Sequence, residues 1–326
     1  MTKLGFAVKI GIVMVGLSAS VAQADSLWVS NYPEEIAEPG IVQDRVFSNE
    51  AVRMLYYHKN VAKSELRWGL WVQNVSTVTA NFQYFMGIGG PAVDGVFAGH
   101  VATREYMTTR TKKQVSEIVL APGERVQLTD QPIKPTMVVS GLVSMMSPSA
   151  GARFRVQMGI VDPAMPLLSL LNDSRTAKMR TAEFSKMTQK QIIQFYTRDN
   201  AKVLPIGDAP FLKDRLSKME LAGNYGLIED YTIQITNNLP VHTTFEMIFS
   251  SAGGVCRGVL VINGSVIETG LFRPPDLSPQ EIYSQVLQPN QTVTLMVSIM
   301  PQAGSNYPVS LVLKAAPTLQ LKGGSV

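Results

Sequence analysis

The chain has 326 residues, 45% of them hydrophobic, and carries 29 Lys and Arg against 25 Asp and Glu. That composition is enough for a sizeable apolar core, and the nearly balanced charge without a dense basic cluster argues against a nucleic acid as partner. The single Cys256 excludes an internal disulfide, and we expect it to be a small buried hydrophobic residue on a strand rather than a catalytic thiol.

Residues 1–24 are typical of a secretory signal peptide. Lys3 and Lys9 supply the positive start, Ile10–Leu17 forms an apolar run, and Ala22–Ala24 provides the small residues of a cleavage site. The apolar run is shorter than the roughly 20 residues that cross a bilayer. We therefore predict cleavage after Ala24 and an exported, soluble chain without a transmembrane segment, in the extracellular space, at the cell wall or in the periplasm.

Short runs with alternating apolar residues, bounded by Gly, Pro, Asn and Ser, follow through most of the chain and predict strands. These runs are Arg67–Val75, Thr79–Met86, Val126–Leu128, Arg153–Ile160, Tyr231–Thr236, Thr244–Phe249, Gly258–Asn263, Thr292–Met300 and Val309–Lys314. The pattern predicts an all-β fold of two antiparallel β-sandwich domains, over residues 25–161 and 221–316, followed by a tail over 317–326. Four prolines interrupt the stretch between them, which predicts a partly helical or irregular bridging segment over 162–220. Its helical candidates are Ala164–Leu171 and a part of Arg175–Gln194, and the second is equally compatible with an exposed connection.

An internal repeat supports a duplication. Val119–Leu128 and Val286–Leu295 share the frame V-L-x-P-x-x-x-V-x-L, and Phe82 and Phe245 precede glycine pairs at the same interval. Downstream, Ser144-Met145-Met146 with Ala150-Gly151 parallels Ser298-Ile299-Met300 with Ala303-Gly304.

The repeated frame has a structural explanation. Pro122-Gly123 and Pro289-Asn290 fit the centre of a type II turn, because Pro presets φ and Gly or Asn accepts the left-handed region that follows. Asn263-Gly264 suits a type I′ turn between two hairpin strands.

Several turn-like motifs resemble landmarks of one family. The motifs are Ser30–Glu34, Glu38–Gly40, Arg53–Asn60, Gly87–Pro91, Gly223–Gly226, Val261–Gly264 and Gly304–Val309. With them the chain resembles exported proteins of Firmicute-type bacteria, of unknown function, which often come with an attached copper amine oxidase N-terminal-like, or stalk, domain. The resemblance implies a location in the cell envelope rather than a reaction. The chain ends soon after the second predicted domain, so we expect no stalk module in it.

The residues do not match amine oxidase chemistry, which needs a modified Tyr and three His ligands to copper. The histidines His58, His100 and His242 lie in three separate segments without ligand spacing, so we expect no metal and no cofactor. A glycosidase would need two carboxylates beside a cleft, and the sequence offers Glu34-Glu35, Asp94, Glu229-Asp230 and Glu246. We assign no catalytic residue, and a hydrolase remains the less favoured interpretation.

Two binding functions remain open. The first is a non-catalytic structural or adhesive protein of the bacterial cell envelope, with a cell-wall or envelope component as partner and an unknown oligomeric state. The second is a carbohydrate-binding module for cell-wall polysaccharide, with ligand-contacting rings among Trp68, Trp71, Tyr56, Tyr57 and Tyr84. Trp68 and Trp71 are three residues apart, so on one strand they face opposite sides. Exposed rings would favour the second function.

Overall fold

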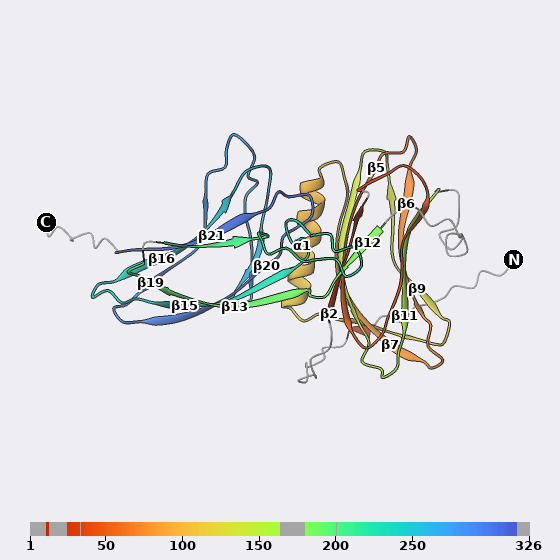
Figure 1. The fold of residues 1–326 in the computed structure, drawn as a ribbon, viewed down its shortest axis with the longest axis horizontal. Helices are drawn as coiled ribbons and strands as arrows, with labels where there is room; N and C mark the ends of the chain where they lie inside the picture. Colours follow the sequence, from red (N-terminus) through yellow and green to blue (C-terminus); the bar gives the residue numbers. More distant parts are fainter. Residues whose placement is uncertain (1–10, 13–24, 33, 164–179, 200, 318–326) are drawn as a thin grey trace. The chain divides into compact units, whose positions relative to one another are not determined.

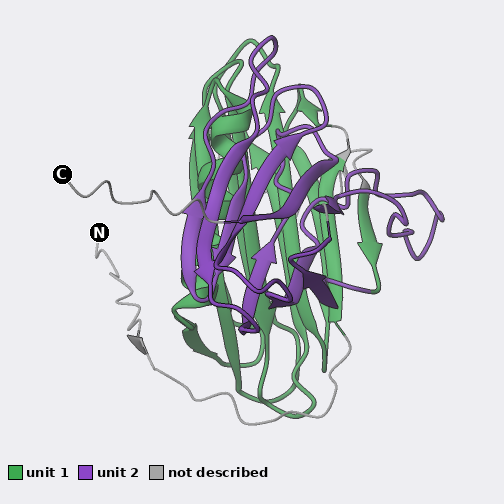
Figure 2. Ribbon diagram, turned by 90° about the vertical axis from the view of Figure 1, so that its left-hand side faces the viewer, with its two compact units in different colours: residues 1–185 green, residues 186–326 purple. Residues whose placement is uncertain are grey.

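The computed structural model describes residues 11–12, 25–32, 34–163, 180–199 and 201–317 (Figure 1). The helical candidate at 164–171, nearly all of the predicted signal peptide and nearly all of the predicted tail lie outside these residues. The chain divides into two compact units, Met1–Ser185 and Lys186–Val326, which Figure 2 draws in different colours. In the described ranges, no helix has the length and apolar character that a membrane crossing requires.

Unit 1 is a two-layer β-sandwich. Its strands are β1 (Gly11–Ile12), β2 (Asp25–Tyr32), β3 (Glu35–Ile36), β4 (Gly40–Phe47), β5 (Ala51–Asn60), β6 (Leu66–Asn74), β7 (Ala80–Ala92), β8 (Ser116–Leu120), β9 (Arg125–Ile133), β10 (Val138–Met146), β11 (Phe154–Val161) and β12 (Arg180–Phe184). One sheet has the order β1-β8-β7-β10-β5-β2-β12 with β3 beside β5, and the other has the order β4-β11-β6-β9. Inward residues of both sheets form one core, which includes Trp28, Met54, Trp68 and Phe154.

A helix, α1 (Gly95–Thr111), lies against β7 and β10 and was not predicted. Its first turn is capped by Asp94, whose carboxylate accepts hydrogen bonds from Val96 N at 2.9 Å and Phe97 N at 3.1 Å. The helix packs closely on β7 because Gly87 has no side chain: a Cβ there would lie 2.1 Å from the Ala102 carbonyl oxygen. Most residues on the buried side of α1 are small or polar, and Tyr106 and Met107 are its large buried side chains, so the sequence shows no continuous apolar stripe of helical period.

Unit 2 is a second two-layer sandwich. Its strands are β13 (Thr188–Tyr196), β14 (Ala201–Ile206), β15 (Ile228–Thr236), β16 (Thr243–Ser251), β17 (Val259–Ile262), β18 (Ser265–Glu268), β19 (Gln280–Leu287), β20 (Thr292–Ile299) and β21 (Val309–Pro317). The sheets have the orders β13-β15-β20-β17-β18 and β14-β21-β16-β19. Tyr231, Phe245, Phe249 and Cys256 belong to the core between them. Cys256 is therefore buried as predicted, but it lies in an isolated β-bridge to Phe272 rather than in a strand.

The two units share one topology, which confirms the predicted duplication within an all-β fold. In unit 1 the order β8-β7-β10-β5-β2 faces β4-β11-β6-β9, and in unit 2 the order β18-β17-β20-β15-β13 faces β14-β21-β16-β19. The pairings β2 with β5 and β13 with β15 are parallel, and the other pairings among these strands are antiparallel. Unit 1 carries α1 where unit 2 has the tight β17–β18 hairpin.

A buried asparagine at a strand end fastens a proline-containing turn at three places. We call this arrangement the asparagine clamp, and it is formed by Asn60, Asn74 and Asn237, each at most 1% exposed. In each clamp the side-chain amide donates to the carbonyl of the last strand residue before the turn, and the backbone carbonyl accepts from the turn residue with positive φ. The first acceptors are Ile133 (2.8 Å), Leu120 (2.8 Å) and Leu287 (3.2 Å), and the second donors are Thr136 (2.7 Å), Gly123 (2.8 Å) and Asn290 (2.8 Å).

The clamps correct the alignment of the repeat. Asn60 holds the turn between β9 and β10, and Asn237 holds the turn between the equivalent strands β19 and β20. The structural counterpart of Pro289 is therefore Pro135, not Pro122, whose turn joins β8 to β9. The pairing of Ser144 with Ser298 is correct, since these residues lie on the equivalent strands β10 and β20.

All nine predicted runs are strands, and the three predicted turns are present. Gly123, Asn290, Asn263 and Gly264 have φ values of 76°, 61°, 48° and 83°. The helical prediction within 175–194 is wrong for its described part, which forms β12 and most of β13. The segment 162–220 likewise contributes β12 to a sheet of unit 1 and β13 and β14 to the sheets of unit 2, so its described part is not a separate bridging segment.

Candidate functional site

The predicted ring surface does not form, because the rings are part of the core of unit 1. Tyr56 and Trp68 are fully buried with ring centroids 5.1 Å apart. Trp71 points to the other side of β6, as predicted, but is only 2% exposed beside Ile41 and Val161.

The remaining two rings do not supply the surface either. Tyr57 is 8% exposed, and the half-buried ring of Tyr84 stacks on Phe82 at 5.6 Å. The prediction that these five residues form an exposed surface for stacking on sugar is therefore wrong. Most of these rings instead contribute to the apolar interior of unit 1.

The histidines occupy different environments. His58 and His100 are each 1% exposed in unit 1, and His58 Nε2 lies 3.0 Å from the Ser30 hydroxyl. His242 is exposed in unit 2. Within the described ranges, no three His, Cys, Asp or Glu side chains are grouped to hold a metal ion.

Most of the candidate carboxylates have structural contacts. Asp94 caps α1, Glu35 pairs with Lys59 at 3.4 Å, and Glu246 pairs with Lys314 at 2.9 Å. Glu229 differs from these, because it is buried and lies at a pocket inside unit 2.

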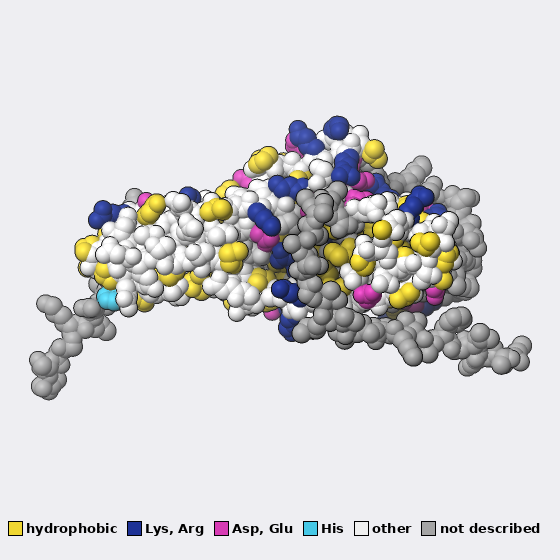
Figure 3. All heavy atoms as spheres, turned by 90° about the horizontal axis from the view of Figure 1, so that it is seen from below, with side chains coloured by type: hydrophobic (Ala, Val, Ile, Leu, Met, Phe, Trp, Pro, Cys, Tyr) yellow, Lys and Arg dark blue, Asp and Glu magenta, His cyan; other side chains and the backbone are white. Residues whose placement is uncertain are grey.

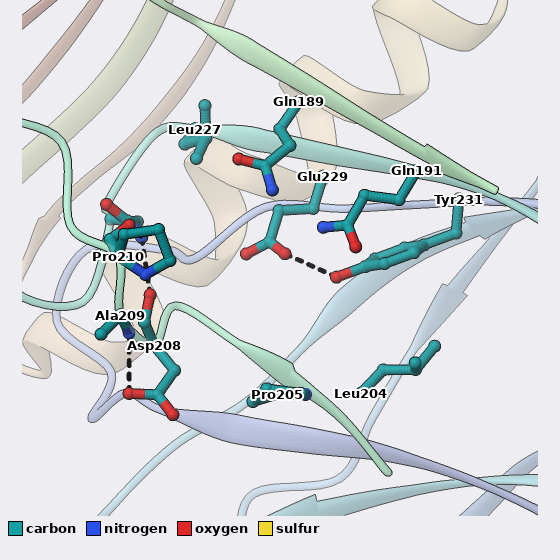
Figure 4. A pocket seen from close by; sticks show the side chains of 11 residues that line it. Gln189, Gln191, Leu204, Pro205, Asp208, Ala209, Pro210, Leu227, Glu229 and Tyr231 are labelled. Carbon is teal, nitrogen blue, oxygen red and sulfur yellow. Dashed lines mark hydrogen bonds between the residues drawn. The ribbon is translucent and has the colours of Figure 1, made fainter. Parts of the chain in front are cut away.

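This polar pocket, of about 220 Å³, lies where the edges of the two sheets of unit 2 meet (Figure 4). Parallel pairing puts Gln189 beside Glu229 and Gln191 beside Tyr231, and Figure 4 shows these four side chains extending to the same side of the two strands. Leu204 and Pro205 come from β14, and the loops add Asp208, Ala209, Pro210, Asn224 and Leu227.

The carboxylate of Glu229 is fixed by two donors. Its Oε1 accepts a hydrogen bond from Gly207 N at 3.0 Å, and its Oε2 accepts one from the Tyr231 hydroxyl at 2.6 Å. Burial raises the pKa of Glu229, while these hydrogen bonds and the charge of Lys186 act in the opposite direction. Burial and the neighbouring carboxylate also raise the pKa of Tyr231, so its hydroxyl is a donor at neutral pH.

Two amides complete the polar wall. Gln189 Oε1 accepts from the Lys186 ammonium at 3.2 Å. The side chain of Gln191, half-buried at the pocket, makes no hydrogen bond to any residue that the structure describes. An amide with open donor and acceptor positions is therefore available inside the pocket.

A second surface feature is the outer face of the sheet that contains β13, β15 and β20. Cross-strand register arranges its residues in four rows, the first of which, Lys190, Asp230 and Ser298, carries charged groups. The other three rows, which we call the uncharged face, are Ile192, Thr232 and Met296; Gln194, Gln234 and Thr294; and Tyr196, Thr236 and Thr292. Ile192 is 74% exposed, Met296 55% and Tyr196 42%. In the view of Figure 3, uncharged and hydrophobic side chains cover most of unit 2 and charged ones are few.

Comparisons with known proteins leave the chain without a family. No family model matches it, and neither does a curated protein. Solved structures that share some similarity include an insecticidal delta-endotoxin from Bacillus thuringiensis, with 11% identity, a TM-score of 0.20 and coverage of 74% of this chain and 53% of the toxin. The chain thus spans about half the length of that toxin.

Another is the N-terminal CBM22 tandem domain of Paenibacillus barcinonensis Xyn10C, with 10% identity, a TM-score of 0.17 and coverage of 94% and 95%. At such scores these likenesses carry no argument about function.

Proposed function

We propose that the chain is an exported, non-catalytic adhesive or structural protein of the bacterial cell envelope. The observation that carries this proposal is the uncharged face of unit 2, with Ile192 and Met296 exposed on the two strands that flank β15. A partner can cover such a face without removing charges from water, which favours stable contact. The partner class is an insoluble component of the envelope.

Export is supported by the position of the first long strand. β2 begins at Asp25, directly after the predicted cleavage site, so removal of the leader takes away only the two-residue edge strand β1 and leaves the strands that the two units share. The resemblance to exported Firmicute-type proteins favours the same compartment. Amino-terminal sequencing of the secreted protein should read Asp25-Ser26-Leu27, and retention of the leader in the mature protein would contradict export by this route.

Adhesion is tested by co-sedimentation of the purified protein with an insoluble envelope fraction, purified peptidoglycan and wall polysaccharide. The double variant Ile192→Lys and Met296→Lys places two charges on the uncharged face and should abolish sedimentation. Val203→Lys with Val286→Lys is the matched control, because these valines are 56% and 52% exposed on the other sheet of unit 2. The proposal fails if the wild-type protein stays in the supernatant, or if both double variants lose binding equally.

The non-catalytic part of the proposal is supported by the contacts of the carboxylates. Asp94 and Glu246 act in a helix cap and an ion pair, and each oxygen of the buried Glu229 carboxylate already accepts one hydrogen bond from an internal donor. Reproducible turnover of a glycan or peptide by the pure protein, lost in Glu229→Gln, would overturn it.

Carbohydrate binding is the second candidate, now without the aromatic rings. The polar pocket favours it, because neutral amides, a carboxylate and aliphatic walls converge there in a space of small-molecule size.

A further inference from the structure

The polar pocket of unit 2 occupies a place that unit 1 fills with core residues. Tyr231 and Glu229 lie six and eight residues before the clamp residue Asn237, and the corresponding positions before Asn60 are Met54 and Val52. Met54 and Val52 are fully buried in unit 1. At these two equivalent positions, unit 1 therefore has apolar core residues, whereas unit 2 has a carboxylic acid and a phenol.

The neighbouring strand shows the same exchange. Gln191 pairs with Tyr231 on β15, and its counterpart in unit 1 is Trp28, which pairs with Met54 on β5. Trp28 is 2% exposed and is among the largest buried side chains of the molecule. Replacing a tryptophan by a glutamine at this place leaves room for the cavity. The pocket is thus a specific alteration of the duplicated fold rather than a packing irregularity common to both copies.

The charges around the pocket select against an anionic ligand. Glu229 and Asp208 bring negative charge, and the ammonium of Lys186, which is bonded to Gln189, offsets part of it. An anion would meet the field of the two carboxylates, and the ammonium weakens their attraction for a cation. A neutral ligand avoids the repulsion and still finds hydrogen-bonding partners in Gln191 and Glu229.

Size and wall chemistry narrow the ligand further. The cavity of about 220 Å³ is below the roughly 300–1,000 Å³ of sites for drug-sized molecules, so it admits little more than one ring. Leu204, Pro205 and Leu227 form an aliphatic wall suited to the C–H face of a saturated ring. Planar amide and carboxylate groups side by side suit the adjacent hydroxyls of such a ring.

We infer that this pocket binds a single neutral, polyhydroxylated ring, as at the end of a glycan, with Gln191 and Glu229 bonded to its hydroxyls. The inference rests on the carbohydrate-binding candidate and is independent of the uncharged face, so the two sites can be tested separately.

Saturation-transfer NMR on the exported chain tests the inference with the methyl glycosides of glucose, galactose, mannose and N-acetylglucosamine as probes. At least one glycoside should receive magnetisation from the protein. Gln191→Ala should weaken its affinity about tenfold, the loss expected for one hydrogen-bonding group. Gln194→Ala is the matched control, because this glutamine lies on the same strand but faces outward, and it should bind as the wild type does.

A filling variant locates the site. Gln191→Trp places in unit 2 the residue that unit 1 carries, and it should abolish glycoside binding while the far-ultraviolet circular dichroism stays unchanged. Transfer to none of the four glycosides overturns the inference, as does unchanged binding in both Gln191 variants, or equal competition by methylammonium or acetate.

The two proposals fail in different ways. Absent glycoside binding with normal sedimentation removes only the pocket ligand. Sedimentation that is lost in Gln191→Trp but retained in Ile192→Lys with Met296→Lys removes only the assignment of adhesion to the uncharged face.

Discussion

The asparagine clamp formed by Asn60 in unit 1 gives the sharpest stability prediction, which concerns the substitution Asn60→Ala. The Asn60 amide donates to the carbonyls of Ser64 at 3.0 Å and Ile133 at 2.8 Å, and its Oδ1 accepts from Ala62 N at 2.8 Å. The side chain is 1% exposed, so water does not replace these bonds readily when it is removed. Alanine leaves two carbonyls and one amide without their partner.

Each lost hydrogen bond of this kind costs about 1 kcal/mol net, and more where the orphaned group stays buried. Three bonds give about 3 kcal/mol. With a urea m value of about 2 kcal/mol per molar, the unfolding midpoint of unit 1 should fall by about 1.5 M.

Tryptophan fluorescence measures this midpoint selectively. The chain has three tryptophans, Trp28, Trp68 and Trp71, and all of them lie in unit 1. Gln127→Ala on β9 is the control, since this exposed glutamine makes only a long contact of 3.3 Å to the Thr129 carbonyl, and its effect should stay within about 0.5 kcal/mol. A midpoint for Asn60→Ala indistinguishable from that of the control would refute the clamp as a stabilising element.

Three further predictions follow from particular positions. Thr136→Gly should stabilise unit 1 by about 1 kcal/mol in the fluorescence assay, because a β-branched residue sits there at φ 69°. Gly87→Ala should destabilise unit 1 by about 3 kcal/mol, since the added Cβ would lie 2.1 Å from the Ala102 carbonyl oxygen. Burial raises the pKa of Glu229 above 4.5, so the folded state holds this proton more tightly than the unfolded chain, and that stability is lost as pH rises through the raised pKa. Amide exchange of β15, corrected for intrinsic rates, should show this decline in the wild type and in Glu246→Gln but not in Glu229→Gln.

Each of these has a result that contradicts it. Thr136→Gly with a lower midpoint means that the lost side chain outweighs the relieved backbone. A Gly87→Ala protein with wild-type stability means that α1 can shift on β7 without cost. If Glu229→Gln leaves the pH dependence of amide exchange in β15 unchanged, another titratable group causes that dependence.

The elements that sequence reasoning found are those in which local pattern and tertiary need agree. Alternating apolar residues over Arg67–Val75 or Thr292–Met300 predict half-buried strands, and the Pro-Gly and Asn-Gly pairs predict turns that the backbone then adopts. Helix α1 was not predicted because its packing depends on close approach to Gly87 and Gly89, and most of the residues on its buried side are small or polar. No periodic apolar signal accompanies that kind of contact.

The repeat shows what a short motif can and cannot carry. V-L-x-P-x-x-x-V-x-L marks a clamped turn, and unit 1 contains two such turns, held by Asn60 and Asn74. The sequence comparison aligned the turn after β8 with the turn of unit 2, because its residues match the shared frame more closely. The turn after β9 is the structural equivalent. A short sequence match therefore indicates a shared turn geometry, whereas the pairing of the strands indicates which elements of the two units are equivalent.

The strand that was predicted as helix or connection, β13, is also the strand that lines the pocket. In a sandwich its inward positions would carry apolar residues, and at Ile193 and Phe195 they do, whereas Gln189 and Gln191 replace them toward the pocket. The alternation that identifies a strand is therefore broken where the binding pocket is built. The equivalent β2 of unit 1 keeps the large apolar Trp28 at the position of Gln191, although it carries the small polar Ser26 at the position of Gln189. The same sandwich topology therefore accommodates Trp28 at this position in unit 1 and a pocket lined by Gln191 in unit 2.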